Sequence, residues 1–175
     1  ALHRAGKKII LVNCSGSPIG LEPETQKCEA ILQAWYPGQQ GGKAVAEVLF
    51  GDYNPAGKLP VTFYRNVSQL PDFEDYNMTG RTYRYMQDVP LFPFGYGLSY
   101  TTFGYGKTVL DKNELTAGQS LKLTVPVTNT GKCNGEEVVQ VYLRKQGDAE
   151  GPIKTLRAFK RVSIPAGKTV NCLLY

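Results

Sequence analysis

The sequence predicts a chain of two unlike halves, a partial and mostly parallel α/β sandwich followed by an antiparallel β-sandwich. In the first half, continuous apolar runs of strand length alternate with stretches of helical spacing, as in parallel strands buried on both faces. From Thr102 onward, short runs with period-two alternation lie between turn clusters, which indicates antiparallel strands. A hydrophobic content of 42% is sufficient for a folded core in each half.

The first predicted strand is Lys8–Cys14 (KIILVNC), a continuous apolar run. One or two helical turns are expected at Glu22–Lys27, and a second strand at about Cys28–Tyr36. Only three strands of the α/β sheet are recognisable, and the opening ALHRAGKK leads directly into the first of them. We therefore expect the sequence to begin midway through a domain.

The most strongly patterned stretch is Ala34–Gly57, which has the features of a strand, a turn, a helix and a second turn. Pro37-Gly38 ends the strand, because Pro lacks a ladder donor and Gly permits a positive φ. Apolar residues at helical spacing predict a helix over Gln40–Phe50, with Gly51 as its C-terminal cap. A third strand is expected at Lys58–Phe63.

The second half contains five predicted strands, and an irregular region precedes them. Tyr64–Pro93 lacks strong periodicity but is rich in aromatic residues, so we expect a structured linker that packs on a surface. The predicted strands are Val109–Leu110, Leu121–Asn129, Glu137–Arg144, Thr155–Ile164 and Thr169–Tyr175.

Several consecutive motifs carry a family resemblance. WYPGQQGGKAVAEVLFGDYNPAGKLPVTF, LPDFEDY, GRTYRY and PLFPFGYGLSYTTF follow one another in this order. Together they resemble the C-terminal part of glycoside hydrolase family 3 enzymes, in detail the bacterial β-xylosidase/β-glucosidase branch. The resemblance implies three parts: the end of an α/β sandwich domain (1–63), a structured linker (64–101) and a fibronectin type III-like β-sandwich (102–175). Such a sandwich normally has about seven strands, so we expect Tyr175 to be a truncated end.

The resemblance also implies the reaction of the parent enzyme, which is retaining hydrolysis of terminal β-linked xylose or glucose from oligosaccharides. That reaction needs two carboxyl groups about 5 Å apart. In the family the nucleophilic Asp lies in an N-terminal (β/α)8 barrel, which 175 residues cannot also hold. The acid/base Glu lies before the strand with which this sequence opens. No catalytic residue is therefore carried over, and the isolated chain is expected to be structural and inactive.

The implied partners are the barrel, the remainder of the α/β domain and, through the parent enzyme, an oligosaccharide. A periplasmic or extracellular location is implied by the resemblance alone. Two alternatives stay open at this point: a stand-alone carbohydrate- or protein-binding module, and an inactive paralogue.

Three neighbouring acids, Asp72, Glu74 and Asp75, are the tempting catalytic candidates within the chain. No continuous apolar segment flanks them to desolvate one of them and raise its pKa. We interpret them as solvated linker charges, with Arg81 or Arg84 as partners. Two further acids, at positions 136 and 137, open a strand, where adjacent side chains point to opposite faces and cannot act together.

Other chemical sites are less strongly indicated. Ser15 and Ser99 lack a general base, since His3 is the only histidine. Gly38–Gly42 resembles a phosphate cradle only weakly, and we interpret its glycines as packing residues. Four aromatic residues have flat faces suited to stacking on sugars, but we interpret them as core and linker anchors; they are Trp35, Tyr36, Tyr83 and Tyr85.

Charge and cysteine content exclude further classes. The net charge of +5 lies entirely in residues 101–175, where Arg157 and other basic residues alternate with apolar ones such as Leu156, Phe159 and Val162. We interpret this pattern as strands with a charged solvent face, since no nucleic-acid-binding motif accompanies it. No apolar run is long enough for a membrane helix.

No metal site or cofactor is expected, because the four cysteines have no metal-ligand spacing. Free buried thiols are favoured, and a Cys133–Cys172 bridge stays open; the four are Cys14, Cys28, Cys133 and Cys172.

Overall fold

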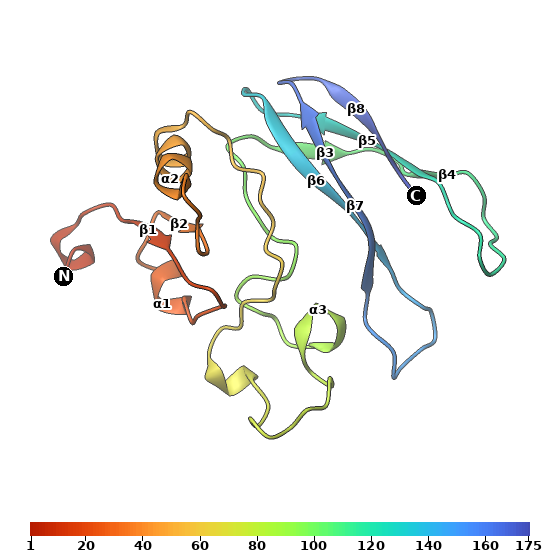
Figure 1. Ribbon diagram of the computed structural model, residues 1–175, viewed down its shortest axis with the longest axis horizontal. Coiled ribbons are helices and arrows are strands. Elements are labelled where there is room, and N and C mark those ends of the chain that lie inside the picture. The colour runs from red at the N-terminus through yellow and green to blue at the C-terminus, as the bar shows by residue number, and fades with distance from the viewer. The chain divides into compact units, whose positions relative to one another are not determined.

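The computed structural model describes all of residues 1–175, which form two compact units. The first unit comprises residues 1–53 and 59–96, and the second comprises 54–58 and 97–175. The chain is mostly β with few helices, and its strands are concentrated in the second unit (Figure 1). None of its helices has the length and apolar character needed to span a bilayer.

The regular structure of the first unit begins with two parallel strands. After a 3-10 turn, η1 (His3–Ala5), strand β1 (Ile10–Asn13) pairs in parallel with β2 (Ala30–Gln33), with Ile10 opposite Ala30. The connection between them contains α1 (Glu22–Thr25), a single helical turn with Pro at its start. The two strands and the helical turn predicted here are confirmed, each with shorter bounds than predicted.

Helix α2 (Gly41–Phe50) confirms the helix predicted from apolar spacing. Gly51 has a φ of 85° and donates its backbone N–H to the carbonyl of Val48, as expected of a C-terminal cap. At the other end Gly41 is buried against Pro37, and a Cβ at this glycine would lie 2.3 Å from the Pro37 Cβ. This glycine is therefore required for close packing, as the sequence indicated.

The strand predicted at Lys58–Phe63 is wrong. The segment instead runs antiparallel to residues 91–96, held by hydrogen bonds between Leu59 and residues 95–96 and between Phe63 and residues 91–92. Pro60 and Pro93 interrupt the ladder between these two points, because neither has an N–H to donate. Phe63 is nevertheless the centre of the unit's small core, and its ring packs edge-on against Trp35 and Phe92.

Two short helical turns organise the linker that completes the first unit. The 3-10 turn η2 (Val67–Gln69) is capped by Asn66, whose side chain accepts a hydrogen bond from the Ser68 N–H. Helix α3 (Thr82–Tyr85) begins with Thr82 at a φ of 57°, which is rare for a β-branched residue. Residues 64–101 therefore contain two short helical turns, the first with a side-chain cap.

The second unit contains two antiparallel sheets. In the first sheet β5 lies between its neighbours, pairing with β3, β4 and β8, while the second sheet consists of β6 and β7. All five predicted strands are confirmed, and β3, with only three residues around Gly104, was missed. The strands are β3 (Phe103–Tyr105), β4 (Val109–Leu110), β5 (Leu123–Asn129), β6 (Gly135–Leu143), β7 (Thr155–Ile164) and β8 (Thr169–Leu174).

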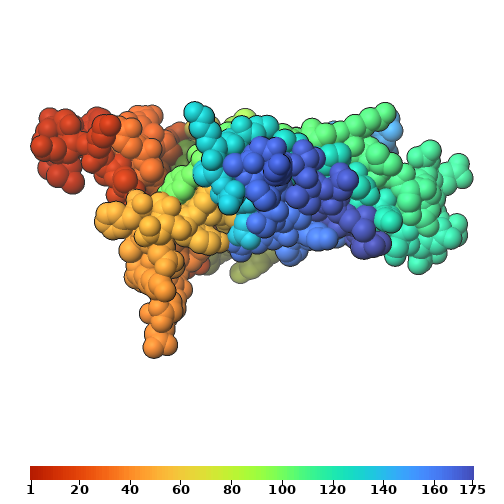
Figure 2. Space-filling model, turned by 90° about the horizontal axis from the view of Figure 1, so that it is seen from above, coloured from red at the N-terminus to blue at the C-terminus, as the bar shows by residue number.

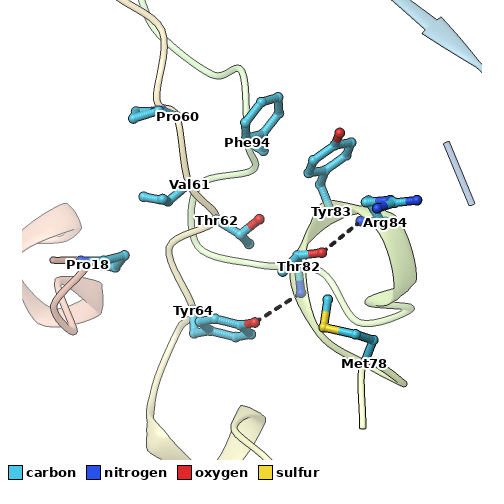
Figure 3. A pocket seen from close by; sticks show the side chains of 10 residues that line it. All are labelled: Pro18, Pro60, Val61, Thr62, Tyr64, Met78, Thr82, Tyr83, Arg84 and Phe94. Atoms are coloured by element: carbon cyan, nitrogen blue, oxygen red, sulfur yellow. Dashed lines mark hydrogen bonds between the residues drawn. The ribbon is translucent and has the colours of Figure 1, made fainter. Parts of the chain in front are cut away.

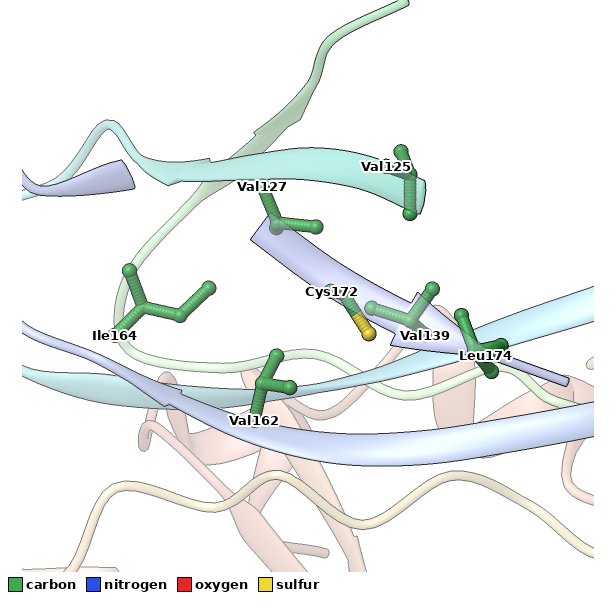
Figure 4. Packing of buried hydrophobic residues seen from close by; sticks show 7 residues of the cluster. All are labelled: Val125, Val127, Val139, Val162, Ile164, Cys172 and Leu174. Carbon is green, nitrogen blue, oxygen red and sulfur yellow. The ribbon is translucent and has the colours of Figure 1, made fainter. Parts of the chain in front are cut away.

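A hydrophobic core lies between these sheets (Figure 4). It takes alternate residues from β5, β7 and β8, as expected of strands with one buried face, and one residue from β6. The sequence interpretation placed Phe159 on the apolar face of its strand, but its side chain is 68% exposed. Phe159 lies three residues before the buried Val162, and residues an odd number apart in a strand point to opposite faces. The core residues are Val125, Val127, Val139, Val162, Ile164, Cys172 and Leu174.

The four cysteines are free, and no Cys133–Cys172 disulfide is formed. Only Cys172 is a buried thiol; Cys14 and Cys133 are exposed, and Cys28 is half-buried. The expectation of free thiols is confirmed, but that of burial is correct only for Cys172.

Seen from above, the blue side chains of the last strands cover the near face of the second unit, and the loop between β4 and β5 projects from one end of that unit (Figure 2).

Candidate functional site

The carboxyl ends of β1 and β2 carry a small polar cluster. Asn13 donates from its amide to Gln33 Oε1 at 2.6 Å and to Ser15 Oγ at 2.9 Å. The Ser15 hydroxyl in turn donates to the carbonyl of Ser17. Ser15 is therefore a structural hydroxyl within an amide network, and it has no general base beside it.

The three linker acids form local turns rather than a catalytic pair. Asp72 and Asp75 each accept a hydrogen bond from a backbone N–H two residues ahead, which is the geometry of an Asx turn. The hydrogen bond from the Asn77 N–H, with further contributions from the Asn77 side chain and the Arg81 charge, lowers the pKa of Asp75. A general acid needs a raised pKa instead. Asp72 and Glu74 are exposed. Arg81 donates to the backbone carbonyl of Asp75 and forms no ion pair with its carboxylate, and Arg84 is not part of this cluster.

Glu136 and Glu137 point to opposite faces of β6, as predicted. Glu136 pairs with Arg161 on the neighbouring strand, and both side chains are partly exposed. Glu137 is buried and its carboxylate lies 3.2 Å from Lys58 Nζ. It also accepts a hydrogen bond of 3.0 Å from the Tyr105 hydroxyl. Burial, followed by the charge of Glu137, raises the pKa of Tyr105.

Sequence reasoning missed this buried pair, because Lys58 and Glu137 are far apart in the chain. Lys58 also donates to the Gly97 carbonyl at 2.8 Å, so its ammonium group has two partners within the unit. A Lys beside turn residues and a Glu at an inward strand position were the only available signals. The arrangement is a closed structural network, because each of its polar groups has a partner within the unit.

Asn54 begins the segment 54–58, which also contains Lys58, and its side chain joins this segment to the rest of the second unit. Its side-chain oxygen accepts hydrogen bonds from the Ser99 hydroxyl at 2.8 Å and from the Tyr100 N–H at 2.7 Å. Its amide donates to the Asn134 carbonyl at 2.9 Å. The Ser99 hydroxyl is thus committed to an amide oxygen, and Ser99 is not an activated nucleophile.

The four candidate aromatic residues do not form a single platform. Trp35 packs against Phe63, and Tyr83 stacks on Phe94 with a centroid separation of 4.2 Å. The guanidinium of Arg84 lies over the ring of Tyr85. Tyr36 is largely exposed and packs over Gly16, where a Cβ would lie 2.5 Å from its ring. Three of the rings are thus anchors within the first unit.

The first unit also contains a pocket of about 380 Å³ beside α3 (Figure 3). Its lining is mainly apolar, and it combines segments that lie far apart in the sequence. Two lining residues, Thr62 and Arg84, carry side-chain atoms that are buried without a hydrogen-bond partner, namely Thr62 Oγ1 and Arg84 Nε. Both residues lie in motifs that carry the family resemblance, but the sequence did not single out either as a ligand-binding residue, and Arg84 was considered only as a partner of the linker acids. The lining residues are Pro18, Pro60, Val61, Thr62, Tyr64, Met78, Thr82, Tyr83, Arg84 and Phe94.

Comparison with models of protein families assigns this chain to a known family. The model of the glycosyl hydrolase family 3 C-terminal domain matches residues 1–100, which is more than half of the chain. This chain belongs to that family. A fibronectin type III-like domain matches residues 137–172 of the family 3 chain, within its β-sandwich.

Curated relatives of this family 3 chain are larger enzymes. It is 60% identical over 174 residues to a xylan 1,4-beta-xylosidase of Xylanibacter ruminicola and 41% identical to a periplasmic beta-glucosidase of Salmonella typhimurium. These alignments cover 99% and 98% of the chain but only 20% and 24% of the relatives. The chain therefore spans about a fifth to a quarter of the length of the curated relatives it matches.

Solved structures show the same fold for the family 3 chain. A β-glucosidase of Erythrobacter marinus superposes with a TM-score of 0.84 at 42% identity, covering 99% of this chain and 23% of that one. Beta-glucosidase 3B of Thermotoga neapolitana, in complex with glycerol, superposes with a TM-score of 0.82 at 32% identity, covering 98% and 26%. Both matches extend over the two units described above.

Within this family 3 chain, no group of three or more His, Cys, Asp and Glu side chains is arranged to hold a metal ion. Its buried carboxylate, Glu137, is neutralised by Lys58, and its linker acids are solvated. The polar groups that lack partners are those of the pocket beside α3.

Proposed function

We propose that this chain is the C-terminal, architectural part of a retaining β-glycosidase that hydrolyses terminal β-linked xylose or glucose from oligosaccharides. The nucleophile and the acid/base would lie in the rest of the enzyme, in a (β/α)8 barrel and in the remainder of the α/β domain. The observation that carries this proposal is that the acidic residues of the chain do not form a catalytic pair of carboxyl groups. The hydrogen bond from the Asn77 N–H lowers the pKa of the linker acid Asp75, and the buried Glu137 is held in an ion pair.

The division of the chain follows from the same proposal. Residues 1–63 would be the end of the α/β sandwich domain, 64–101 a structured linker and 102–175 the fibronectin type III-like sandwich. The parallel pairing of β1 and β2 supports a place in a larger, mostly parallel sheet, since parallel strands are normally covered on both faces. The relative named as a periplasmic beta-glucosidase supports a location outside the cytoplasm.

The decisive test is turnover by the purified 175-residue chain. We expect no hydrolysis of 4-nitrophenyl β-xyloside or β-glucoside above the buffer rate, with the Xylanibacter ruminicola xylosidase as the positive control. Hydrolysis that the triple variant Asp72→Asn, Glu74→Gln, Asp75→Asn abolishes would overturn the proposal. In the complete enzyme the same triple variant should keep kcat within about twofold, because solvated turn carboxylates far from an acid/base pair supply no transition-state stabilisation.

A binding module is the competing function, and calorimetry separates the two. Saturable binding of xylo- or gluco-oligosaccharides that Tyr83→Ala or Tyr85→Ala abolishes would favour it. We expect no such binding, because Tyr83 is stacked on Phe94 and Tyr85 faces the Arg84 guanidinium.

A further inference from the structure

The pocket beside α3 contains polar atoms that the protein itself leaves unsatisfied. Thr62 is only 7% exposed, and its Oγ1, turned toward α3 in Figure 3, has no hydrogen-bond partner. Arg84 Nε is likewise buried and unpartnered. Buried polar groups in folded proteins are almost always hydrogen-bonded, and each exception requires a physical explanation. Two exceptions in the lining of one pocket indicate that their partner comes from outside the unit.

The charge of Arg84 is also uncompensated. Every ion pair in the chain involves other residues, and Arg84 has no carboxylate within 4 Å. Its guanidinium has only the ring of Tyr85 as a neighbour of complementary charge distribution. A partly buried guanidinium without an acid is the group that most favours an anionic oxygen as its partner.

The pocket presents hydrogen-bond donors and no acid. Tyr64 accepts a hydrogen bond from the Thr82 N–H at 3.2 Å, so its own hydroxyl proton is available to donate. Thr62 can donate from its hydroxyl, and Arg84 donates from Nε. None of the lining residues is Asp, Glu, Asn or Gln. A neutral sugar needs acceptors for its many hydroxyl protons, whereas a carboxylate only accepts, so the lining favours a carboxylate.

The size and lining of the pocket define the rest of the ligand. A volume of about 380 Å³ lies within the range of small-molecule sites, which combine an apolar lining with a few polar groups. Pro18, Pro60, Val61, Met78 and Phe94 provide the apolar part. A body of the size of one ring fits such a lining.

Local backbone geometry holds the polar groups in place. Thr82 has a φ of 57°, a strained conformation for a β-branched residue. Its Oγ1 accepts a hydrogen bond from the Arg84 N–H at 3.3 Å, and its own N–H donates to Tyr64 (Figure 3). The strained residue therefore connects two of the donors of the pocket. Such strain is concentrated at binding and catalytic sites.

From these observations we propose that the pocket beside α3 binds a small organic carboxylate with an apolar body of about one ring, with its oxygens at Arg84 and Thr62. The binding is non-covalent and separate from glycoside hydrolysis, so it does not depend on the proposed function.

Binding to the 175-residue chain tests this proposal, with benzoate as the probe and benzyl alcohol as the uncharged probe of equal shape. We expect saturable binding of benzoate by calorimetry, and at least tenfold weaker binding of benzyl alcohol, because the charge-assisted hydrogen bonds are absent. Glucuronate, a carboxylate with a hydroxylated body, should also bind at least tenfold more weakly. Equal affinity for benzoate and benzyl alcohol, tighter binding of glucuronate, or no binding of benzoate would each overturn the proposal.

Three variants locate the site. Arg84→Gln should weaken benzoate binding at least tenfold, whereas Arg81→Gln should not change it, since Arg81 lies outside the pocket and donates to Asn77. Thr62→Val keeps the shape of the side chain and should weaken binding about fivefold without lowering the melting temperature of the ligand-free chain. If Arg84→Gln fails to fold, Thr62→Val alone still decides, because unchanged affinity in this folded variant would overturn the assignment.

Discussion

The two units of this chain treat their buried polar groups in opposite ways. In the second unit the fully buried side chain of Asn129 accepts hydrogen bonds from Thr101 and Gly131 and donates to the carbonyls of Cys133 and Ile164. In the first unit Thr62 Oγ1 and Arg84 Nε are buried with no partner. The second unit thus provides partners for its own buried polar groups, whereas the first unit keeps hydrogen-bonding capacity for the ligand proposed above.

The hydrophobic cores of the two units also differ, and the core of the second unit is the larger. The second unit buries a continuous cluster of seven residues between two sheets. In the first unit the large buried hydrophobic residues are Leu21, Phe63 and Met86, and Phe50 and Phe73 are more than four-fifths exposed. A unit with so small a core has less hydrophobic stabilisation to offset unsatisfied polar groups.

The largest expected effect is the loss of the Asn129 network. Asn129→Ala leaves two carbonyls and two donors without partners, so we expect a loss of about 4 kcal/mol in the free energy of unfolding of the second unit. Denaturant titration followed by far-UV circular dichroism measures this loss, because most strands belong to that unit. Asn171→Ala, at an exposed position of β8, is the control and should change little. Similar losses from both variants would contradict the idea of a self-satisfied second unit.

The buried ion pair comes next. Glu137→Ala leaves Lys58 buried without its acid, and we expect a loss of about 3 kcal/mol in the same titration. The double variant Lys58→Met, Glu137→Leu should recover most of this loss, because an apolar pair of similar size replaces a buried ion pair at little cost. If the double variant is as unstable as Glu137→Ala, the uncompensated charge is not the cause.

Two threonines with equal exposure give the sharpest contrast between the units. Thr62 and Thr101 are each 7% exposed, but only Thr101 has a partner, Asn129 Oδ1 at 2.6 Å. We expect Thr101→Val to destabilise the second unit by about 1.5 kcal/mol, and Thr62→Val to stabilise the first by about 1 kcal/mol, since it removes an unsatisfied hydroxyl. The fluorescence of Trp35, the single tryptophan, follows the first unit. Destabilisation by both substitutions would remove the distinction between the units.

The smallest effect is a pH dependence of the second unit. Burial and the charge of Glu137 raise the pKa of Tyr105 above its usual value. The folded state therefore retains the Tyr105 proton when the unfolded chain releases it, and the stabilisation is complete below the ordinary tyrosine pKa of about 10. Above that pH the free energy of unfolding should fall, and more steeply in the native chain than in Tyr105→Phe. Parallel stability curves for the two proteins between pH 9 and 11 would show that Tyr105 does not contribute.

Local sequence patterns predicted the elements but not the long-range contacts. Helix α2 follows from its apolar spacing and from Gly51, and the strands of the second unit follow from alternation and turns, which are properties of neighbouring residues. The strand at Lys58–Phe63 failed because a β-rich composition outweighed Pro60 in the prediction. The pairing of Lys58 with Glu137 depends on how the strands are arranged in space, which no local pattern contains.

The pocket was also beyond prediction from the sequence. Its lining comes from Pro18, from residues 60–64 and from residues 78–94, and only the folded chain brings these segments together. A threonine in a predicted strand and an arginine in a linker give no indication of whether their polar atoms will find a partner. The linker acids, by contrast, could be assigned to solvent in advance, because a charged turn without apolar neighbours cannot be desolvated.

The segment 54–58 has a consequence for how this protein could be divided. The chain passes from the first unit to the second at residue 54, returns at 59 and leaves again after 96, so no single cut separates the two units. An excised segment 97–175 would carry Glu137 without Lys58, and Asn134 without Asn54. Recombination of genes at the linker would thus break a charge pair. Because residues 54–58 belong to the second unit but precede part of the first in the sequence, we expect the two units to be inherited together rather than exchanged separately.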